Sequence, residues 1–553
     1  MNAILLILLA IAIFVVAYLT YGRYLAKEWG LDAKNVTPAH TMEDGVDYSP
    51  AKTPVLLGHH FSSIAGAGPI NGPIQAAFFG WLPVFLWIVI GGIFFGAVQD
   101  FGSIVVSIRH KGKSLGEVIE ENIGHKCKVL FIIFAWLVLI LVIAAFADIV
   151  ASSFTIADPT VSMANGSVAT ASMLFIPLAI AFGFIVHRKN APLLVSTIGG
   201  IVVLALAIGI GLAFPLNLPK TFWLGFVFIY IMIASVTPVW VLLQPRDYLS
   251  SFLLYFMIIA AVIGIVGSNP AIVTPAFVGF EVSGNFIFPV LFITVACGAV
   301  SGFHSLIGSG TTSKQLDKES DALAIGYGSM LIECVLAVIS LIAIGVVSET
   351  GAIPTDLGTP TVVFSTAISG FFSMMGFGSG VVNATYTIIA LAVSAFCLTS
   401  LDTATRLGRF MFQELFAGKD SKENILNNMY VATAITAVFG FVLCLAGYAN
   451  VWPLFGACNQ LVAVPAFLAI AVYMGKQKRN NKMLYFPMIF MICATFTSLY
   501  ITFTSNISKL MDGSGVIIKE GLQCVIIVPI VICAVILVIE GCKVLIATEK
   551  ANK

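Results

Sequence analysis

The chain has 553 residues, of which 59% are hydrophobic and only 10% are charged. An ordinary soluble domain carries about 25% charged residues, so this composition excludes an ordinary soluble protein and indicates one that crosses a membrane many times. Lysine and arginine nearly balance aspartate and glutamate, leaving a net charge of +1, and no basic domain or tail offers a surface for nucleic acid. We therefore expect a lipid bilayer as the environment, and no nucleic-acid partner.

Apolar runs of about 20 residues, the length that crosses a bilayer core, recur from end to end. The first begins at Ala3, with no lysine or arginine before it and no small-residue cleavage pattern after it, so we expect an uncleaved helix that starts outside the cell. We predict an all-α polytopic protein with about fifteen spans. They lie near residues 3–21, 55–80, 82–108, 128–152, 169–186, 192–213, 221–242, 249–267, 286–308, 321–347, 378–400, 428–447, 452–474, 484–505 and 519–543.

Alternate connections between these spans are basic. Examples are Arg109, Lys111 and Lys113, then Arg246, then Lys314 and Lys318, and finally Lys476 and Lys478. The connections between them, such as 268–285 and 348–377, contain neither lysine nor arginine. Because basic loops remain in the cytoplasm, this pattern predicts an N-terminus outside the cell and a C-terminus in the cytoplasm.

Two stretches far apart in the chain read almost alike: Phe61 to Gly68 (FSSIAGAG) and Phe303 to Gly310 (FHSLIGSG). Both lie in apolar segments, where paired glycines loosen a helix and bare backbone groups that hydrocarbon cannot satisfy. Matching helix breaks in two halves are typical of the substrate site of a secondary transporter. The alternative is a chance match, because the chain has 49 glycines and small residues also serve close helix packing.

The topology makes the two broken helices antiparallel, and four predicted spans follow each of them. This arrangement predicts two inverted repeats of five helices, at residues 55–213 and 286–475, each with a discontinuous first helix. The peripheral parts are an extra helix and cytoplasmic segment at 1–54, two inserted helices at 214–285 and two C-terminal helices at 476–553.

The first break belongs to a longer motif, Gly58 to Pro73, followed by Gln99 to Gly102 and Arg109 to Ser114. With Gly302 to Thr312 and Leu398 to Arg406, these motifs closely resemble the carbon starvation protein A (CstA) family of bacterial inner-membrane transporters. The resemblance covers nearly the whole chain. It implies the amino acid, polyamine and organocation superfamily with its LeuT-like repeat, and uptake of a carbon source during starvation, as peptides or as pyruvate with a proton.

The broken helices predict where a substrate binds. Half-helix N-termini carry partial positive charge, which suits the carboxylate that pyruvate shares with the C-terminus of a peptide. The predicted substrate-binding residues are His59, His60, Ser62, Ser63, Gly66, Gly68, Phe303, His304, Ser305, Gly308 and Gly310. Neighbours on a helix point about 100° apart, so one of the adjacent histidines is expected to pack structurally. The serines have an alternative role as well, bonding to a carbonyl one turn back.

Acidic residues inside spans are candidates for ion coupling, because a charge in lipid is costly. Glu333 lies nearest mid-membrane and is the leading proton carrier, whereas Asp402 can simply pair with Arg406, and Asp100 with Arg109. Hydroxyl groups add possible sodium ligands, as the family resemblance implies. The predicted ion-coupling residues are Asp100, Asp148, Glu333, Thr399, Ser400, Asp402 and Thr403.

The ten cysteines include no C-x-x-C pair, and no Cys/His spacing typical of zinc occurs, so we expect no disulfide, metal site or cofactor beyond a coupling ion, H⁺ or Na⁺.

The leading interpretation is an ion-coupled symporter of the bacterial plasma membrane, with the proton favoured over sodium. A passive channel for small carboxylates is the alternative, although no carbonyl filter such as T-V-G-Y-G supports it. The sequence contains no paired catalytic motif that would indicate an enzyme. Peptide versus pyruvate and the oligomeric state stay open.

Overall fold

The computed structural model describes residues 2–45, 47–156, 164–188, 192–355, 357–416, 425–445 and 447–552. These residues form twenty-two α-helices and one short hairpin of two strands. The helices are α1 (Ala3–Ala17), α2 (Arg23–Glu28), α3 (Pro38–Thr41), α4 (Thr53–Ile64), α5 (Gly68–Ala76), α6 (Trp81–Gly91), α7 (Ala97–Arg109), α8 (Leu115–Asn122), α9 (His125–Phe154), α10 (Ala164–Gly183), α11 (Leu193–Ala213), α12 (Lys220–Val236), α13 (Leu243–Ser268), α14 (Ile287–Val295), α15 (Gly302–Gly310), α16 (Ser329–Val347), α17 (Pro360–Met374), α18 (Ser379–Phe416), α19 (Met429–Cys444), α20 (Tyr448–Lys476), α21 (Tyr485–Met511) and α22 (Leu522–Ala551). The strands are β1 (Glu281–Val282) and β2 (Asn285–Phe286), antiparallel with Glu281 opposite Phe286.

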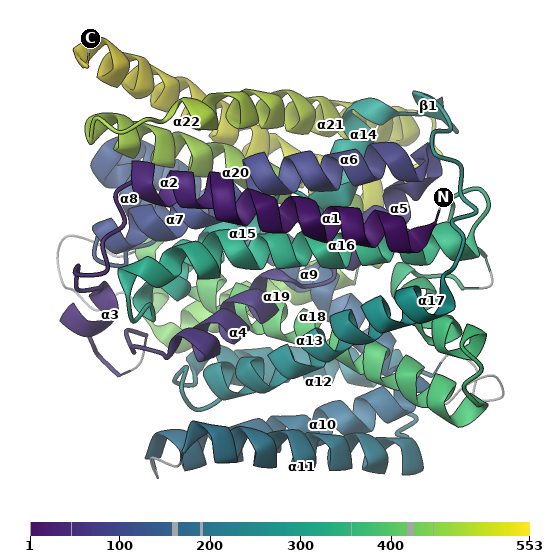
Figure 1. Ribbon diagram of the computed structural model, residues 1–553. Coiled ribbons are helices and arrows are strands. Elements are labelled where there is room, and N and C mark those ends of the chain that lie inside the picture. Colours follow the sequence, from purple (N-terminus) through teal and green to yellow (C-terminus); the bar gives the residue numbers. More distant parts are fainter. Residues whose placement is uncertain are drawn as a thin grey trace.

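The helices lie side by side in one bundle, with α10 and α11 along one edge and α21 and α22 along the opposite edge (Figure 1). The N-terminus and the C-terminus lie at opposite ends of the helices (Figure 1). A bilayer requires helices, because backbone groups must pair within each spanning segment. It also favours apolar side chains on the outside of the bundle and polar ones inside.

In the described ranges, twelve helical stretches are long and apolar enough to cross a membrane. The prediction of an all-α polytopic membrane protein is therefore confirmed. The three other predicted spans correspond to shorter units: 55–80 consists of α4 and α5, whereas α12 has 17 residues and α19 has 16. The number of fifteen crossings thus depends on these three units and stays a prediction.

The first predicted break is present. Residues 65–67, which we call break 1, leave the helix between α4 and α5. Pro69 is the second residue of α5, where its missing N–H costs no intrahelical bond, so the sequence restarts the helix there. The chain therefore enters the bundle as one half-helix and continues as another.

The second break is displaced from the predicted position. We expected it at Gly308, but that residue lies inside α15 and Gly310 is the last residue of this helix. The interruption precedes the motif: residues 296–301, which we call break 2, form a short 3₁₀ turn and an extended segment between α14 and α15. The prediction was wrong because glycine within a helix also permits close packing, and a Cβ on Gly310 would lie 2.4 Å from Leu407 Cδ2.

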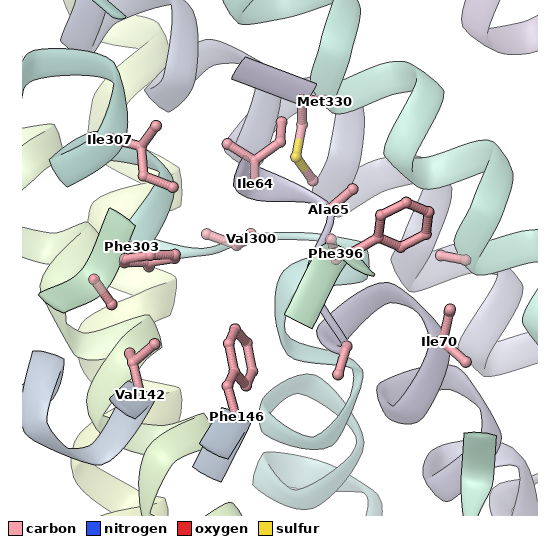
Figure 2. Close-up of a cluster of buried hydrophobic side chains, with 14 of the residues drawn as sticks. Ile64, Ala65, Ile70, Val142, Phe146, Val300, Phe303, Ile307, Met330 and Phe396 are labelled. Atoms are coloured by element: carbon pink, nitrogen blue, oxygen red, sulfur yellow. The ribbon is translucent and has the colours of Figure 1, made fainter. Parts of the chain in front are cut away.

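The two breaks meet inside the bundle. A Cβ on Gly68 would lie 2.5 Å from the Cβ of Cys297, and a Cβ on Gly72 would lie 2.3 Å from the Val295 carbonyl oxygen. Ala65 of break 1 and Val300 of break 2 belong to one cluster of buried apolar side chains, which also contains Phe303 (Figure 2). In Figure 1 the pair α4–α5 and the pair α14–α15 run in opposite directions.

Candidate functional site

Four half-helix ends converge at the two breaks. α4 and α14 end there, so they direct C-terminal carbonyls toward the centre, whereas α5 and α15 begin there and direct N–H groups toward it. The N-terminal ends of α5 and α15 both carry the partial positive charge of the helix dipole. The arrangement is therefore suited to a small anion at the centre of the bundle.

The start of α15 is fixed by polar side chains from α20 and α7. Asn459 Oδ1 accepts a hydrogen bond from the Phe303 N–H at 2.8 Å, and Asn459 Nδ2 donates to Ser301 Oγ at 3.1 Å. Gln99 Nε2 donates to the Ser301 carbonyl oxygen at 2.6 Å. These contacts replace the helical bonds that break 2 gives up, and they hold the break in one conformation.

His304 forms a buried cluster with two carboxylates, directly after break 2. Its Nδ1 lies 2.9 Å from Asp100 Oδ2 of α7, and its Nε2 lies 3.6 Å from Glu333 Oε2 of α16. All three side chains are fully buried. We call this group the histidine–carboxylate cluster. It brings together three of the predicted residues, and a carboxylate pair around an imidazole can hold and release protons.

Several buried polar atoms around this cluster have no hydrogen-bond partner among the described residues. They are His304 Nε2, Asp100 Oδ1, both carboxylate oxygens of Glu333, Gln99 Oε1, Ser103 Oγ and His60 Nε2. A stable protein rarely leaves so many polar atoms unpaired in one place. The concentration of these atoms makes this the candidate functional site, because protons, water or a ligand would satisfy them.

The two adjacent histidines of α4 have different partners. His59 Nδ1 lies 2.8 Å from Asp247 Oδ2, whereas His60 Nδ1 lies 2.8 Å from Thr312 Oγ1. Both side chains are buried. Neighbouring side chains on a regular α-helix point about 100° apart, so His59 and His60 do not converge on one point.

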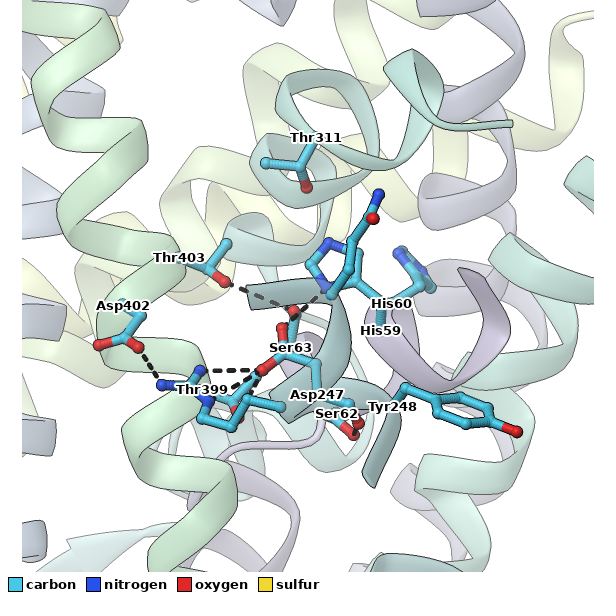
Figure 3. Close-up of polar contacts among 12 residues, drawn as sticks. His59, His60, Ser62, Ser63, Asp247, Tyr248, Thr311, Thr399, Asp402 and Thr403 are labelled. Atoms are coloured by element: carbon cyan, nitrogen blue, oxygen red, sulfur yellow. Dashed lines mark hydrogen bonds and ion pairs between the residues drawn. The ribbon is translucent and has the colours of Figure 1, made fainter. Parts of the chain in front are cut away.

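His59 joins a larger group of buried ions, which we call the buried ion network (Figure 3). Arg246 contacts two carboxylates at once, Asp247 at 2.9 Å and Asp402 of α18. Tyr230 donates to Asp402 Oδ2 at 2.9 Å. The network ties α4, α12, α13 and α18 together through charge pairs that no solvent reaches.

The structure contradicts one expectation, the loop position of Arg246, and both of the alternative ion pairs given above. Arg246, expected in a basic cytoplasmic connection, is 1% exposed in α13 because carboxylates on both sides compensate its charge. Asp402 therefore pairs with Arg246 and not with Arg406, whose guanidinium donates to the carbonyls of Ala234 and Thr237. Likewise Asp100 pairs with His304, while Arg109 pairs with Glu319.

The predicted hydroxyl residues divide into two groups. Near the end of α4, Ser63 Oγ lies 3.4 Å from Thr403 Oγ1, and Ser400 Oγ donates to the Ser63 carbonyl oxygen at 2.9 Å. Thr399 instead donates to Asp247 Oδ1 at 3.0 Å, and Ser62 donates to the Asp247 carbonyl oxygen at 3.2 Å. All of these groups belong to the interface between α4 and its neighbours α13 and α18.

Other predicted residues lie in structural roles. Ser305 Oγ donates to the Gly302 carbonyl oxygen at 2.6 Å, which is the local bond that we gave as the alternative. A Cβ on Gly66 would lie 2.9 Å from Ser400 Oγ, and one on Gly308 would lie 3.2 Å from Ile104 Cγ1, so both glycines admit a neighbouring helix. Asp148, far along α9, pairs with Lys220 at 2.8 Å and belongs to neither polar group.

Sequence reasoning missed Arg246 and Asp247, Tyr230, Gln99 and Asn459 as members of the site. Each was visible as a polar residue in or beside an apolar run, a position that indicates an interior polar contact. Asn459, for example, lies in the middle of a predicted span. What the sequence does not give is the partner, because most of these contacts join residues more than 150 positions apart, such as Asp402 and Arg246.

The chain is similar to a protein family, to curated transporters and, more distantly, to solved structures. The family model described as "Carbon starvation protein CstA" matches residues 2–357 and 352–498. The peptide transporter CstA of Campylobacter jejuni is 35% identical over 89% of this chain and 79% of its own length. The pyruvate/proton symporter BtsT of Escherichia coli is 31% identical over 87% of this chain and 78% of its own length. Among solved structures, the Eremococcus coleocola manganese transporter, in complex with an aromatic bis-isothiourea compound, matches with a TM-score of 0.49 and 14% identity, over 92% of this chain and 99% of that one.

Proposed function

The chain belongs to the carbon starvation protein CstA family, and from this premise we propose that it is an ion-coupled symporter that imports pyruvate or a peptide. We infer that the coupling ion is the proton and that the protein works in the bacterial plasma membrane during carbon starvation. The relatives support transport as the activity, since they are named as peptide transporters and as a pyruvate/proton symporter.

One observation carries the proposal: the histidine–carboxylate cluster lies directly beside break 2. Its imidazole is 2.9 Å from Asp100 and 3.6 Å from Glu333, with no solvent contact. An imidazolium next to two carboxylates leaves a net negative charge, and the binding of a further proton neutralises it. Because a buried net charge is costly in the membrane, loading and unloading of this proton changes the stability of the surrounding conformation. That is the property a coupling site needs.

The substrate carboxylate is proposed to bind between the two breaks. The N-terminal ends of α5 and α15 supply positive potential there, and the unpaired Ser103 hydroxyl on α7 could donate a hydrogen bond. The adjoining apolar side chains, among them Phe303 and Phe146, would surround the rest of a small solute. A carboxylate is common to pyruvate and peptides, so this geometry supports the substrate class.

We propose that the chain is organised as the two inverted repeats 55–213 and 286–475, with the N-terminus outside and the C-terminus in the cytoplasm. The antiparallel course of α4–α5 and α14–α15 supports this organisation (Figure 1). In such a repeat, transport proceeds by rocking of one group of helices against another around the central site.

Sodium coupling is the second candidate, and one observation favours it. Ser400 Oγ, Thr403 Oγ1 and the Ser63 carbonyl oxygen lie together at the end of α4. Oxygen ligands of this kind suit a hard cation. Sodium would replace the hydrogen bonds that these hydroxyls now make.

Uptake into proteoliposomes tests the proposal. Labelled pyruvate and labelled di- and tripeptides would be offered under an imposed proton gradient, then under an imposed sodium gradient. We expect accumulation above the external concentration for one solute class when the proton gradient is present, and its loss when a protonophore collapses that gradient. Equilibration without accumulation would identify the passive channel, and accumulation driven by sodium alone would refute proton coupling.

A further inference from the structure

A cavity of about 370 Å³ opens at the end of the bundle that carries the loop before α8. Its walls come from the C-terminal end of α15, from α18, from the loop 111–114 with the first turn of α8, and from the segment before α4. Side chains used below are Tyr48, Lys113, Glu117, Lys314, Phe410 and Glu414. The volume lies in the range of pockets that hold small molecules.

The cavity lies one short helix away from the central site. α15 has nine residues, which corresponds to about 13 Å at 1.5 Å per residue. Its first residue, Gly302, adjoins break 2, and its last residues, Ser309 and Gly310, line the cavity. α15 therefore connects break 2 to the wall of this cavity.

The charges of the cavity wall are unequally compensated. Glu117 pairs with Lys113 at 3.1 Å and with Lys128 at 3.4 Å, and Glu414 lies 3.5 Å from Lys128. The two acidic groups of the wall are thus already paired with lysines, which they share with Glu120 and Glu121. Lys314 is in a different situation, because it takes part in no ion pair within the described ranges.

The ammonium group of Lys314 is held by aromatic rings. Its Nζ lies 4.8 Å from the ring centre of Phe410 and 5.3 Å from that of Tyr48. A cation over a ring face is stabilised, but less than a cation that meets a carboxylate. Tyr48 belongs to the segment before α4, and its hydroxyl donates to the Lys111 carbonyl oxygen at 3.2 Å. Two rings therefore keep the ammonium in the cavity, available to an incoming anion.

We propose that Lys314 is a second, transient binding site for the carboxylate of the transported solute, on the inner side of the path. The proposal rests on the proposed function, because it takes the solute to be a carboxylate that leaves the central breaks toward this cavity. During exit, the ammonium group exchanges its aromatic contacts for the carboxylate and then releases it to the aqueous phase. The phosphate of an anionic lipid shares this chemistry, so the test must separate the two ligands.

The test compares the two faces of the membrane. Right-side-out and inverted vesicles would contain the wild type, Lys314→Met, Lys314→Arg or the matched control Lys318→Met, which removes an exposed lysine from the same loop. We expect Lys314→Met to raise the KM measured at the inner face about tenfold, with the KM at the outer face unchanged. Lys314→Arg should retain most of the affinity, and Lys318→Met should match the wild type. A similar increase of KM at both faces, or at neither, would overturn the proposal.

A binding measurement separates this proposal from the proposed function. In a Tyr48→Trp variant, the indole would lie beside Lys314, as the Tyr48 ring does now. Titration with pyruvate or a dipeptide should then change the indole fluorescence, and Lys314→Met should remove that change. No response in detergent would refute the Lys314 site even if uptake is normal, and a response without any uptake would refute only the proposed function. If the effect of Lys314→Met on KM appears in vesicles with phosphatidylglycerol but not in phosphatidylcholine alone, the ligand is a lipid phosphate and the proposal fails.

Discussion

Arg246 on α13 and Asp402 on α18 form an ion pair from which solvent is absent: the two side chains are 1% and 0% exposed. A second partner of Arg246, Asp247, lies 2.9 Å away and is equally buried. Removing one member of such a group leaves a buried charge without its counter-charge, which is more damaging than the loss of the attraction itself.

Replacement of Arg246 by methionine tests this relationship. We expect Arg246→Met to destabilise the protein by about 3–5 kcal/mol, seen as a lower thermal midpoint and poor recovery in detergent. The double variant Arg246→Met with Asp402→Asn should recover part of the loss, because one of the uncompensated charges is gone. If Arg246→Met melts like the wild type, the network does not hold these helices together.

His304 lies at the centre of the proposed proton-coupling site. We expect His304→Gln to lose accumulation driven by a proton gradient, because the neutral amide cannot carry the proton between Asp100 and Glu333. Exchange of labelled for unlabelled solute, which needs no net proton movement, should persist. The matched control is His125→Gln, since the His125 side chain is 73% exposed. Accumulation by His304→Gln at the wild-type level would contradict this role.

Gly68 allows the two breaks to touch. An added Cβ would lie 2.5 Å from the Cys297 Cβ, so Gly68→Ala should force the breaks apart and reduce uptake about tenfold. Cys297→Gly in the same chain should restore part of the activity, because it removes the opposing atom. Gly209→Ala is the control, as no atom lies within 4 Å of its added Cβ. Equal uptake by Gly68→Ala and Gly209→Ala would argue against contact between the breaks.

Ser63 and Ser305 occupy equivalent positions of the two motifs but have different contacts. Ser63 faces Thr403 across the interface between α4 and α18, whereas Ser305 bonds to its own helix. We therefore expect Ser63→Ala to lose uptake and Ser305→Ala to remain within about threefold of the wild type, since a local helix bond contributes little. Initial uptake rates normalised to membrane protein measure this difference. The reverse order of effects would assign the substrate contact to the second motif.

The loop beside α8 gives an expectation for pH. The Lys113 ammonium, 2.7 Å from Glu121 Oε1, lowers the pKa of that carboxyl below its ordinary value. A lowered pKa in the folded state means that the stabilisation is present above the unfolded pKa and is lost as pH falls through the folded value. The melting temperature of the wild type should be slightly higher than that of Glu121→Gln at pH 7, and this gap should close below about pH 4. The gap stays small because both groups are exposed. A gap that is constant with pH would show that the ion pair contributes nothing.

The sequence was sufficient to predict the all-helical membrane fold and the first break, because apolar length and the Gly-x-Gly-Pro pattern act locally. It predicted that Glu333 and His304 are ionisable residues inside the bundle, but it did not predict that Asp100 completes their cluster. The second break was misplaced because Gly308 and Gly310 serve packing against Ile104 and Leu407, which lie on distant helices. Arg246 was placed in a loop for a similar reason: its counter-charge on Asp402 is 156 residues away.

The buried ion network has a consequence for how the bundle can move. Arg246 contributes one positive charge and Asp247 and Asp402 contribute two negative ones, while Arg406 is paired with Asp47 at 3.5 Å. Arg246 on α13 serves one carboxylate on its own helix and one on α18, so sliding either helix past the other would leave a buried carboxylate without its counter-charge. The two helices should therefore travel as one rigid unit in any conformational change.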